Sequence, residues 1–358
     1  MTTGRGRRSG AWPAPVQRLV DIMVGAHVSI MVCLGLRLGL YRALKDAGPV
    51  TSADVAARTG LHERWVLEWL RGQATAGLIS YRGDGRFELP AELVALLADD
   101  NHVMFLGHNF DSLPAKMNFV ERLPESFRTG LGLSFDDFGA DAAASGELLF
   151  RNWYREVLVP IALPWLDGVV AKLKMGAKVA DIGCGAGIAL IEMAKAFPQS
   201  EFHGYEISEH AIARAEANRE EAGTGNVAFH NVTSDQLPTD GSFDLITAFD
   251  CLHDMTQPDQ VTAAIRAAVS PDGTWFIVDI DCAPTFEGNL NNPFAPMLYT
   301  FSVLGCMSSG LSEPGGAGLG TCGLPEPAMR ELVNGAGFTR FRRLDVRHPT
   351  NAYYEARP

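Results

Sequence analysis

The longest apolar stretch of the chain lies near its amino end. Residues 15–45 carry apolar side chains on almost every side of the helices expected there, and a helix that is apolar all round must be covered on all sides. We therefore predict one or two buried helices, covered by a second copy of the chain in a homodimer. The most apolar part, residues 22–36, is short and contains glycine, histidine and serine, so we expect no membrane span.

Residues 48–90 show the pattern of a winged helix-turn-helix. Thr51-Ser-Ala-Asp54 is a capping sequence for a helix over 53–59, a second helix is expected over 62–75, and Gly83-Asp-Gly85 indicates the hairpin of a wing. Such a unit often binds DNA. Here five arginines balance five acidic residues over 50–90, and the second helix, with Trp65 and its apolar neighbours, is expected to pack into the core. We therefore do not expect DNA to be a partner.

The next segment, residues 92–174, is expected to be mostly helical. It is rich in aromatic residues, most of which should pack in a core. Because the segment joins two domains, and pockets favour domain boundaries with aromatic and polar linings, it also supplies candidate substrate contacts. These candidates are His108, Asn109, Trp153 and Tyr154.

From residue 177 onward, predicted strands and helices alternate, which indicates an α/β fold with a doubly wound sheet. Five strands are expected at 178–182, 202–206, 227–231, 243–248 and 274–279, and four helices at 188–197, 209–222, 257–269 and 325–336. Two further strands, at 338–345 and 352–355, follow each other without a helix between them. A stretch rich in glycine, serine, asparagine and proline, about 283–322, is predicted to form a lid over the substrate.

The first strand of this sheet leads into a glycine-rich turn, Asp181-Ile-Gly-Cys-Gly-Ala-Gly187. Glycine allows a tight turn and lets a ligand approach the backbone, and the following helix directs its free N–H groups at that ligand. The position where a dinucleotide fingerprint has its third glycine is Ile188, which argues against NAD or FAD. Asp181 would attract an ammonium group. Glu206 ends the next strand about 20 residues later, where a carboxylate can bind ribose hydroxyls.

The glycine turn together with Glu206 resembles motifs I and II of class I S-adenosylmethionine-dependent methyltransferases. The resemblance implies a Rossmann-like, seven-stranded sheet whose last strand is antiparallel, and S-adenosyl-L-methionine as cofactor. The winged helix resembles the dimerisation domain that precedes small-molecule O-methyltransferases. The cofactor-binding residues that we predict are Asp181, Gly183, Cys184, Gly185, Gly187, Glu206, Ile207, Ser234, Asp235, Phe249 and Asp250.

The fourth strand ends in Phe249-Asp-Cys-Leu-His-Asp-Met255. In the O-methyltransferase family, Leu-His-Asp at this place supplies a general base, and the resemblance implies that role for His253, oriented by Asp254 or Asp250. The tryptophan that follows the aspartate in the family is Met255 here. The same resemblance extends over residues 15–358 to bacterial methyltransferases and methyltransferase-like regulators.

Composition limits the alternatives. The chain of 358 residues has a net charge of −12, which disfavours nucleic acid, and no apolar leader segment is visible at its amino end. Its six cysteines include no C-x-x-C pair, so we predict no metal site and a reduced, cytoplasmic protein. We expect a tail at 1–14, a winged-helix domain at 15–95, a helical connector at 96–175 and a cofactor-binding domain at 176–358.

The function predicted from these features is methyl transfer to a small molecule, at oxygen. Two alternatives remain open at this point. One is a transcriptional regulator that binds S-adenosylmethionine as a ligand, and the other is a cofactor-binding protein without catalysis.

Overall fold

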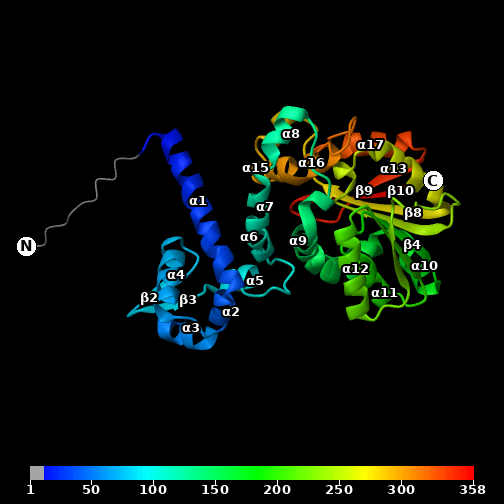
Figure 1. Cartoon of the computed structure of the whole chain (residues 1–358). Helices are drawn as coiled ribbons and strands as arrows, with labels where there is room; N and C mark the ends of the chain where they lie inside the picture. Colours follow the sequence, from blue (N-terminus) through cyan, green and yellow to red (C-terminus); the bar gives the residue numbers. More distant parts are fainter. Residues whose placement is uncertain (1–11) are drawn as a thin grey trace, which may run out of the picture. The chain divides into compact units, whose positions relative to one another are not determined.

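The structure, a computed structural model, describes residues 12–358, which form two compact units (Figure 1). The first unit ends at Leu113 and the second begins at Pro114, inside the segment that the sequence predicts as a connector. Residues 1–11 of the predicted tail lie outside the described residues, and Ala14 already belongs to a helix.

The first unit contains the predicted winged helix. Thr51 accepts a hydrogen bond from the backbone N–H of Asp54, and the Asp54 carboxylate accepts one from the N–H of Thr51, so the predicted capping box is confirmed. The three short strands form an antiparallel sheet in the order β1-β3-β2. The elements are α1 (Ala14–Arg37), α2 (Leu40–Leu44), β1 (Val50–Thr51), α3 (Ser52–Thr59), α4 (Glu63–Thr75), β2 (Ser80–Gly83), β3 (Arg86–Glu88), α5 (Ala91–Leu97) and α6 (Gly107–Asp111).

Helix α1 is largely exposed in the single chain, and its burial against a second copy stays a prediction. Only its second half packs on the winged helix, where the Trp69 indole N–H donates to the Met31 carbonyl over 2.8 Å. Gly35 lies directly against the Trp69 ring, since a Cβ at this position would be 2.3 Å from a ring atom. Its apolar side chains elsewhere are largely exposed: Leu19, Ile22, Met23, Val24 and Ile30. By length and composition alone, α1 is also the one described helix that could cross a membrane.

Helix α4 buries less of its apolar surface than the sequence suggests. Val66, Trp69 and Leu70 lie in the core of the first unit, but Trp65 is 79% exposed. Trp65 was expected in the core, and that expectation is wrong because it lies on the outer face of α4, next to charged Arg64 and Glu68, which pair with each other.

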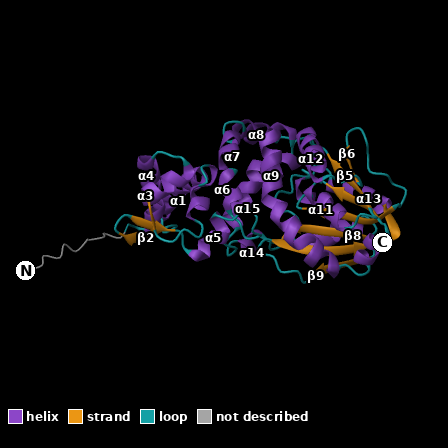
Figure 2. Cartoon of the chain, turned by 90° about the horizontal axis from the view of Figure 1, so that it is seen from below, coloured by secondary structure: helices purple, strands orange, loops and turns teal. Residues whose placement is uncertain are grey.

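The second unit begins with the predicted helical segment. Helix α9 continues without a break into a wider π-helical stretch, Tyr154–Ala162, so that Trp153 and Tyr154 mark the junction of the two helical forms. In Figure 2, α7, α8 and α9 lie to one side of the sheet. They are α7 (Leu113–Phe119), α8 (Leu123–Thr129), a 3₁₀ turn (Asp136–Phe138), α9 (Gly139–Trp153), the π-helical stretch, a second 3₁₀ turn (Leu163–Trp165) and α10 (Val169–Met175).

The seven-stranded sheet that the sequence predicts is confirmed, in the order β6-β5-β4-β7-β8-β10-β9. Neighbours from β6 to β8 are parallel, whereas β10 runs antiparallel to both β8 and β9. Helices α10 to α12 cover one face of the sheet, and α13 and α17 cover the other (Figure 1). Their bounds are β4 (Lys178–Ile182), α11 (Ile188–Ala196), β5 (Glu201–Glu206), α12 (Glu209–Ala222), β6 (Val227–Asn231), β7 (Phe243–Phe249), α13 (Pro258–Ala268), β8 (Val269–Ile280), α17 (Glu326–Gly335), β9 (Arg340–Leu344) and β10 (Asn351–Arg357).

The predicted lid segment contains short helical pieces between β8 and α17. It is attached to an earlier loop, since the Gly132 N–H donates to the Leu311 carbonyl over 2.9 Å and the Leu133 N–H donates to the Ser308 hydroxyl over 2.8 Å. The pieces are α14 (Phe286–Asn289), α15 (Ala295–Phe301), a π-helical turn (Ser302–Cys306) and α16 (Met307–Gly310).

Candidate active site

The glycine turn lies between β4 and α11, as predicted. Gly183, Gly185 and Gly187 have φ of +67°, +53° and +74°, which side chains other than glycine rarely adopt. A Cβ on Gly183 would lie 2.8 Å from Cys251, and one on Gly187 would lie 2.3 Å from the Phe229 ring. At Gly185 a Cβ would meet no described atom within 4 Å, so this residue offers open backbone that a ligand can approach.

Glu206 holds its carboxylate beside this turn. One oxygen accepts the N–H of Gly185 over 2.9 Å, and the other accepts the N–H groups of Ile207 and Ser208 over 2.8 and 3.0 Å. Burial raises the pKa of Glu206, although the three backbone donors oppose that shift. The backbone thus fixes the carboxylate at the end of β5, while the Ile207 side chain itself is half exposed.

Asp181 is the second buried carboxylate at the turn. Its Oδ1 accepts the Thr247 hydroxyl over 2.6 Å, and the residue is 2% exposed. Burial, with a smaller contribution from Glu206, raises the pKa of Asp181 to about 7, because the charged form is poorly solvated there. A cationic ligand group beside Asp181 would stabilise the charged carboxylate and so lower its pKa.

Four further residues of the predicted cofactor set are placed as follows. Cys184 is buried in the core against one face of the sheet. Ser234 and Asp235 lie exposed in the loop after β6, where the Ser234 hydroxyl donates to the Asn231 carbonyl and the Asp235 carboxylate pairs with Nδ1 of His230 over 2.5 Å. Phe249 is buried at the end of β7.

Two of the predicted substrate contacts surround Phe249. The ring centroids of Trp153 and Tyr154 each lie 5.8 Å from that of Phe249, and the Trp153 indole N–H donates to the Tyr353 hydroxyl over 3.0 Å. Burial, followed by the charges of Asp181 and Asp250, raises the pKa of Tyr154 well above its ordinary value. The π-helical junction therefore brings an aromatic hydroxyl close to the acidic side chains at the ends of β4 and β7.

The other two predicted contacts, His108 and Asn109, lie on α6 in the first unit, where the His108 ring packs edge-on against Phe105 at 4.7 Å. Substrate contact by His108 and Asn109 stays a prediction.

Asp250 begins the turn after β7 in a left-handed conformation with φ of +50°. Its N–H donates to the Val278 carbonyl over 2.8 Å, and its carboxylate accepts the Asn351 amide over 2.5 Å. Burial and the neighbouring charge of Asp279 raise the pKa of Asp250 to about 8. The strained backbone is held in place by hydrogen bonds on both sides.

His253 lies in the 3₁₀ turn Leu252–Asp254, only 2% exposed, between two carboxylates. Its Nδ1 is 2.6 Å from Asp279 Oδ1, and its Nε2 is 3.1 Å from Asp254 Oδ1. Burial alone would lower the pKa of His253, but the charges of Asp279 and Asp254 outweigh it and raise the pKa well above its ordinary value.

Sequence reasoning missed the partner of His253 Nδ1. We expected Asp254 or Asp250 to orient the ring. Asp254 lies at Nε2, but the partner of Nδ1 is Asp279 on β8, and the Ile280 N–H donates to the same Asp279 oxygen over 2.7 Å. The sequence does carry one signal for this contact, since Asp279 is an acidic residue in an otherwise apolar strand. Because β7 and β8 are adjacent parallel strands, their ends lie together and bring Asp279 close to His253.

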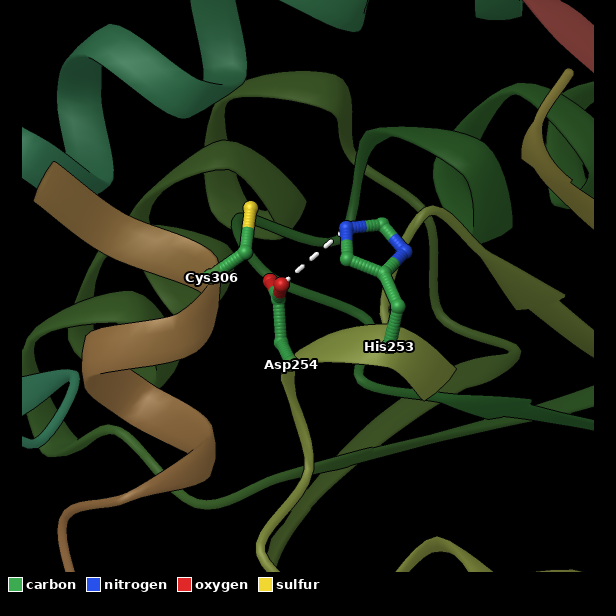
Figure 3. Close-up of side chains that lie close together, drawn as sticks. All are labelled: His253, Asp254 and Cys306. Atoms are coloured by element: carbon green, nitrogen blue, oxygen red, sulfur yellow. Dashed lines mark ion pairs between the residues drawn. The ribbon is translucent and has the colours of Figure 1, made fainter. Parts of the chain in front are cut away.

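Cys306 of the lid segment also reaches this site, which the sequence did not predict. Its Sγ lies within 4.8 Å of both a ring nitrogen of His253 and a carboxylate oxygen of Asp254 (Figure 3). Burial, and then the charge of Asp254, raises the pKa of the Cys306 thiol to about 11.

Two family profiles match the chain over these elements. Residues 173–299 match the family described as a methyltransferase domain, and residues 26–99 match an Rv2258c-like winged helix-turn-helix domain. The chain carries a methyltransferase domain behind a winged helix. The methyltransferase match covers the glycine turn, Glu206 and His253 together.

Relatives and solved structures agree with this assignment. The chain is 30% identical over 151 residues to the ubiquinone biosynthesis O-methyltransferase of Paracidovorax citrulli, which covers 40% of this chain and 62% of that protein. In a second such protein, from Cupriavidus pinatubonensis, the match at 30% identity covers 35% of this chain and 49% of that protein. The chain therefore spans about half to two thirds of these relatives.

Among solved structures, an O-methyltransferase family protein from Burkholderia thailandensis matches with a TM-score of 0.69 at 17% identity, over 97% of this chain and 99% of that one. Human N-acetylserotonin methyltransferase in complex with S-adenosylmethionine matches with a TM-score of 0.66 at 17% identity, with the same coverage. At these identities the likeness establishes the fold of both units.

Proposed function

We propose that this protein transfers the methyl group of S-adenosylmethionine to a small-molecule acceptor, at an oxygen atom. The observation that carries the proposal is the placement of a glycine turn, two buried carboxylates and a histidine at the ends of adjacent strands β4, β5 and β7. In a parallel sheet of this kind, ligands bind at the carboxyl ends of the strands.

The residues present fit the cofactor. Asp181 would hold its ammonium group and Glu206 its ribose hydroxyls, because carboxylates accept strong hydrogen bonds from both. Gly185 leaves room for close approach, while Ser234 and Asp235, on the loop after β6, would contact the adenine. S-adenosylmethionine supplies an electrophilic methyl group when it is bound.

The chain's own chemistry centres on His253. In its neutral form, Nε2 accepts the proton of the acceptor hydroxyl while Asp279 keeps the other nitrogen protonated and stabilises the imidazolium that forms. Because two carboxylates favour the charged ring, the neutral form becomes available as pH rises. Much of the rate comes from positioning, and a base adds about 10²–10⁴-fold.

The exposed apolar face of α1 supports the predicted homodimer. Leu19, Ile22, Met23 and Ile30 are each more than half exposed, although they lie on a regular helix. Apolar area of this kind is stabilised when a second surface covers it, and a second copy of the chain offers a matching apolar face. The cytoplasmic location stays a prediction from the sequence.

The variant His253→Gln tests the chemistry. It should lower the rate of S-adenosylhomocysteine release by about 10²–10⁴-fold with any hydroxylated acceptor that the wild type methylates. Its affinity for S-adenosylmethionine should stay close to that of the wild type. His210→Gln is the matched control, since His210 lies exposed on α12. Loss of cofactor affinity in His253→Gln alone would place His253 in the cofactor site instead.

A further inference from the structure

Three potential metal ligands converge at the site, although they come from two segments far apart in the chain. His253 and Asp254 belong to the 3₁₀ turn after β7, and Cys306 ends the π-helical turn of the lid segment. One donor atom of each lies within 4.8 Å of the other two. Figure 3 shows the three side chains close together, with a ring nitrogen of His253 paired with the Asp254 carboxylate.

The hydrogen bond at Nδ1 of His253 is of the kind that orients histidines bound to metal ions. Its Nδ1 hydrogen-bonds to Asp279 over 2.6 Å, and Asp279 is itself fixed by the Ile280 N–H. A carboxylate behind the distal ring nitrogen fixes the orientation of the imidazole and increases the basicity of the other nitrogen. That other nitrogen, Nε2, faces Asp254.

The carboxylates around the ring are incompletely satisfied. Asp254 Oδ1 lies 3.1 Å from Nε2, yet it accepts no hydrogen bond of good geometry, and Oδ2 of Asp279 is likewise buried without a hydrogen-bond partner among the described residues. A buried carboxylate oxygen without a partner is unfavourable. A cation between Nε2, the Asp254 carboxylate and the Cys306 sulfur would supply the interaction that Asp254 Oδ1 lacks.

We propose that His253, Asp254 and Cys306 form a binding site for a thiophilic divalent cation of the Zn²⁺ class. Imidazole, carboxylate and thiolate are the ligands that Zn²⁺ takes, and three of them leave one position open for water or another oxygen. Mg²⁺ and Ca²⁺ prefer oxygen ligands alone, so they are disfavoured. On binding, the cation displaces the protons of the thiol and of Nε2.

The site as such does not depend on methyl transfer. One consequence, however, rests on the proposed function: a cation on Nε2 occupies the lone pair that would accept the hydroxyl proton. Occupancy therefore prevents His253 from acting as a base.

The test uses the full-length chain, freed of metal with a chelator, and needs neither cofactor nor acceptor. Titration with Co²⁺ should give one bound ion per chain and the near-ultraviolet charge-transfer band of a cobalt–thiolate bond. Zn²⁺ should displace the Co²⁺ and abolish the band. Absence of the band in the folded wild type would overturn the proposal.

Three variants locate the ion. Cys306→Ser should abolish the charge-transfer band. Asp279→Asn should retain the band but weaken Zn²⁺ binding by about 10–100-fold, as loss of a carboxylate behind a ligating histidine does.

The third variant is the matched control, the double variant Cys282→Ser/Cys322→Ser, which removes a neighbouring thiol pair whose Cys282 Sγ contacts the Cys322 carbonyl. It should retain the band. Loss of the band in the double variant, or its persistence in Cys306→Ser, would place the ion elsewhere and refute the site.

Discussion

The most informative prediction concerns the pH dependence of cofactor binding through Asp181. This carboxylate is 2% exposed, and its burial raises its pKa to about 7. In the proposed site it binds the ammonium group of the cofactor, and it can do so well only when it is ionised. Affinity should therefore rise as pH rises through 7 and fall as pH falls.

The magnitude follows from the fraction of Asp181 that is ionised. With a pKa of about 7, half of the side chains are charged at pH 7 and about 3% at pH 5.5, while the ligand amine, with a pKa of about 7.7–8.0, stays protonated over this range. The affinity for S-adenosylhomocysteine, measured by calorimetry, should fall about fifteenfold between pH 7 and pH 5.5.

Asp181→Asn is the control for this profile, because asparagine still offers an oxygen to the Thr247 hydroxyl. The variant should bind about ten- to a hundredfold more weakly at pH 7, the value of a hydrogen bond to a charged group, and its affinity should change little with pH. A wild-type profile as flat as that of the variant would refute the role assigned to Asp181.

Two further predictions concern other parts of the molecule. Glu206→Gln should weaken S-adenosylhomocysteine binding by about tenfold or more in calorimetry, because the ribose hydroxyls lose a charged acceptor, whereas Glu201→Gln, at the exposed start of the same strand, should bind as the wild type does; equal losses in both would contradict the assignment. In light scattering, the wild type should show twice the mass of one chain at micromolar concentration. Ile22→Glu should raise the dimer dissociation constant by about a hundredfold or more, because the interface would bury an unpaired carboxylate, and Gln17→Glu should not. A monomeric wild type would refute the dimer.

The parts of the fold that depend on local sequence were predicted well. The glycine turn, the capping box at Thr51 and the alternation of strands and helices are each determined by residues close together in the chain. The antiparallel last strand also followed, since β9 and β10 are joined without a helix.

The parts that depend on contacts between residues far apart in the chain were not predicted from the sequence. Asp279 and Cys306 reach His253 only because β8 lies beside β7 and the lid segment folds back over the strand ends. No characteristic spacing of residues in the sequence marks either contact. The apolar pattern of α1 indicates that it needs covering, and the single chain does not supply that cover, so burial against a second copy stays a prediction. The expected burial of Trp65 was wrong because an aromatic residue at helical spacing does not always lie on the packed face of its helix.

The central claim is that the glycine turn and its two carboxylates bind S-adenosylmethionine. Calorimetric titration of S-adenosylmethionine, and separately of S-adenosylhomocysteine, into the wild-type protein at neutral pH tests it directly. We predict micromolar binding of both ligands, at one site per chain. Absence of binding of either ligand to the folded protein would contradict it.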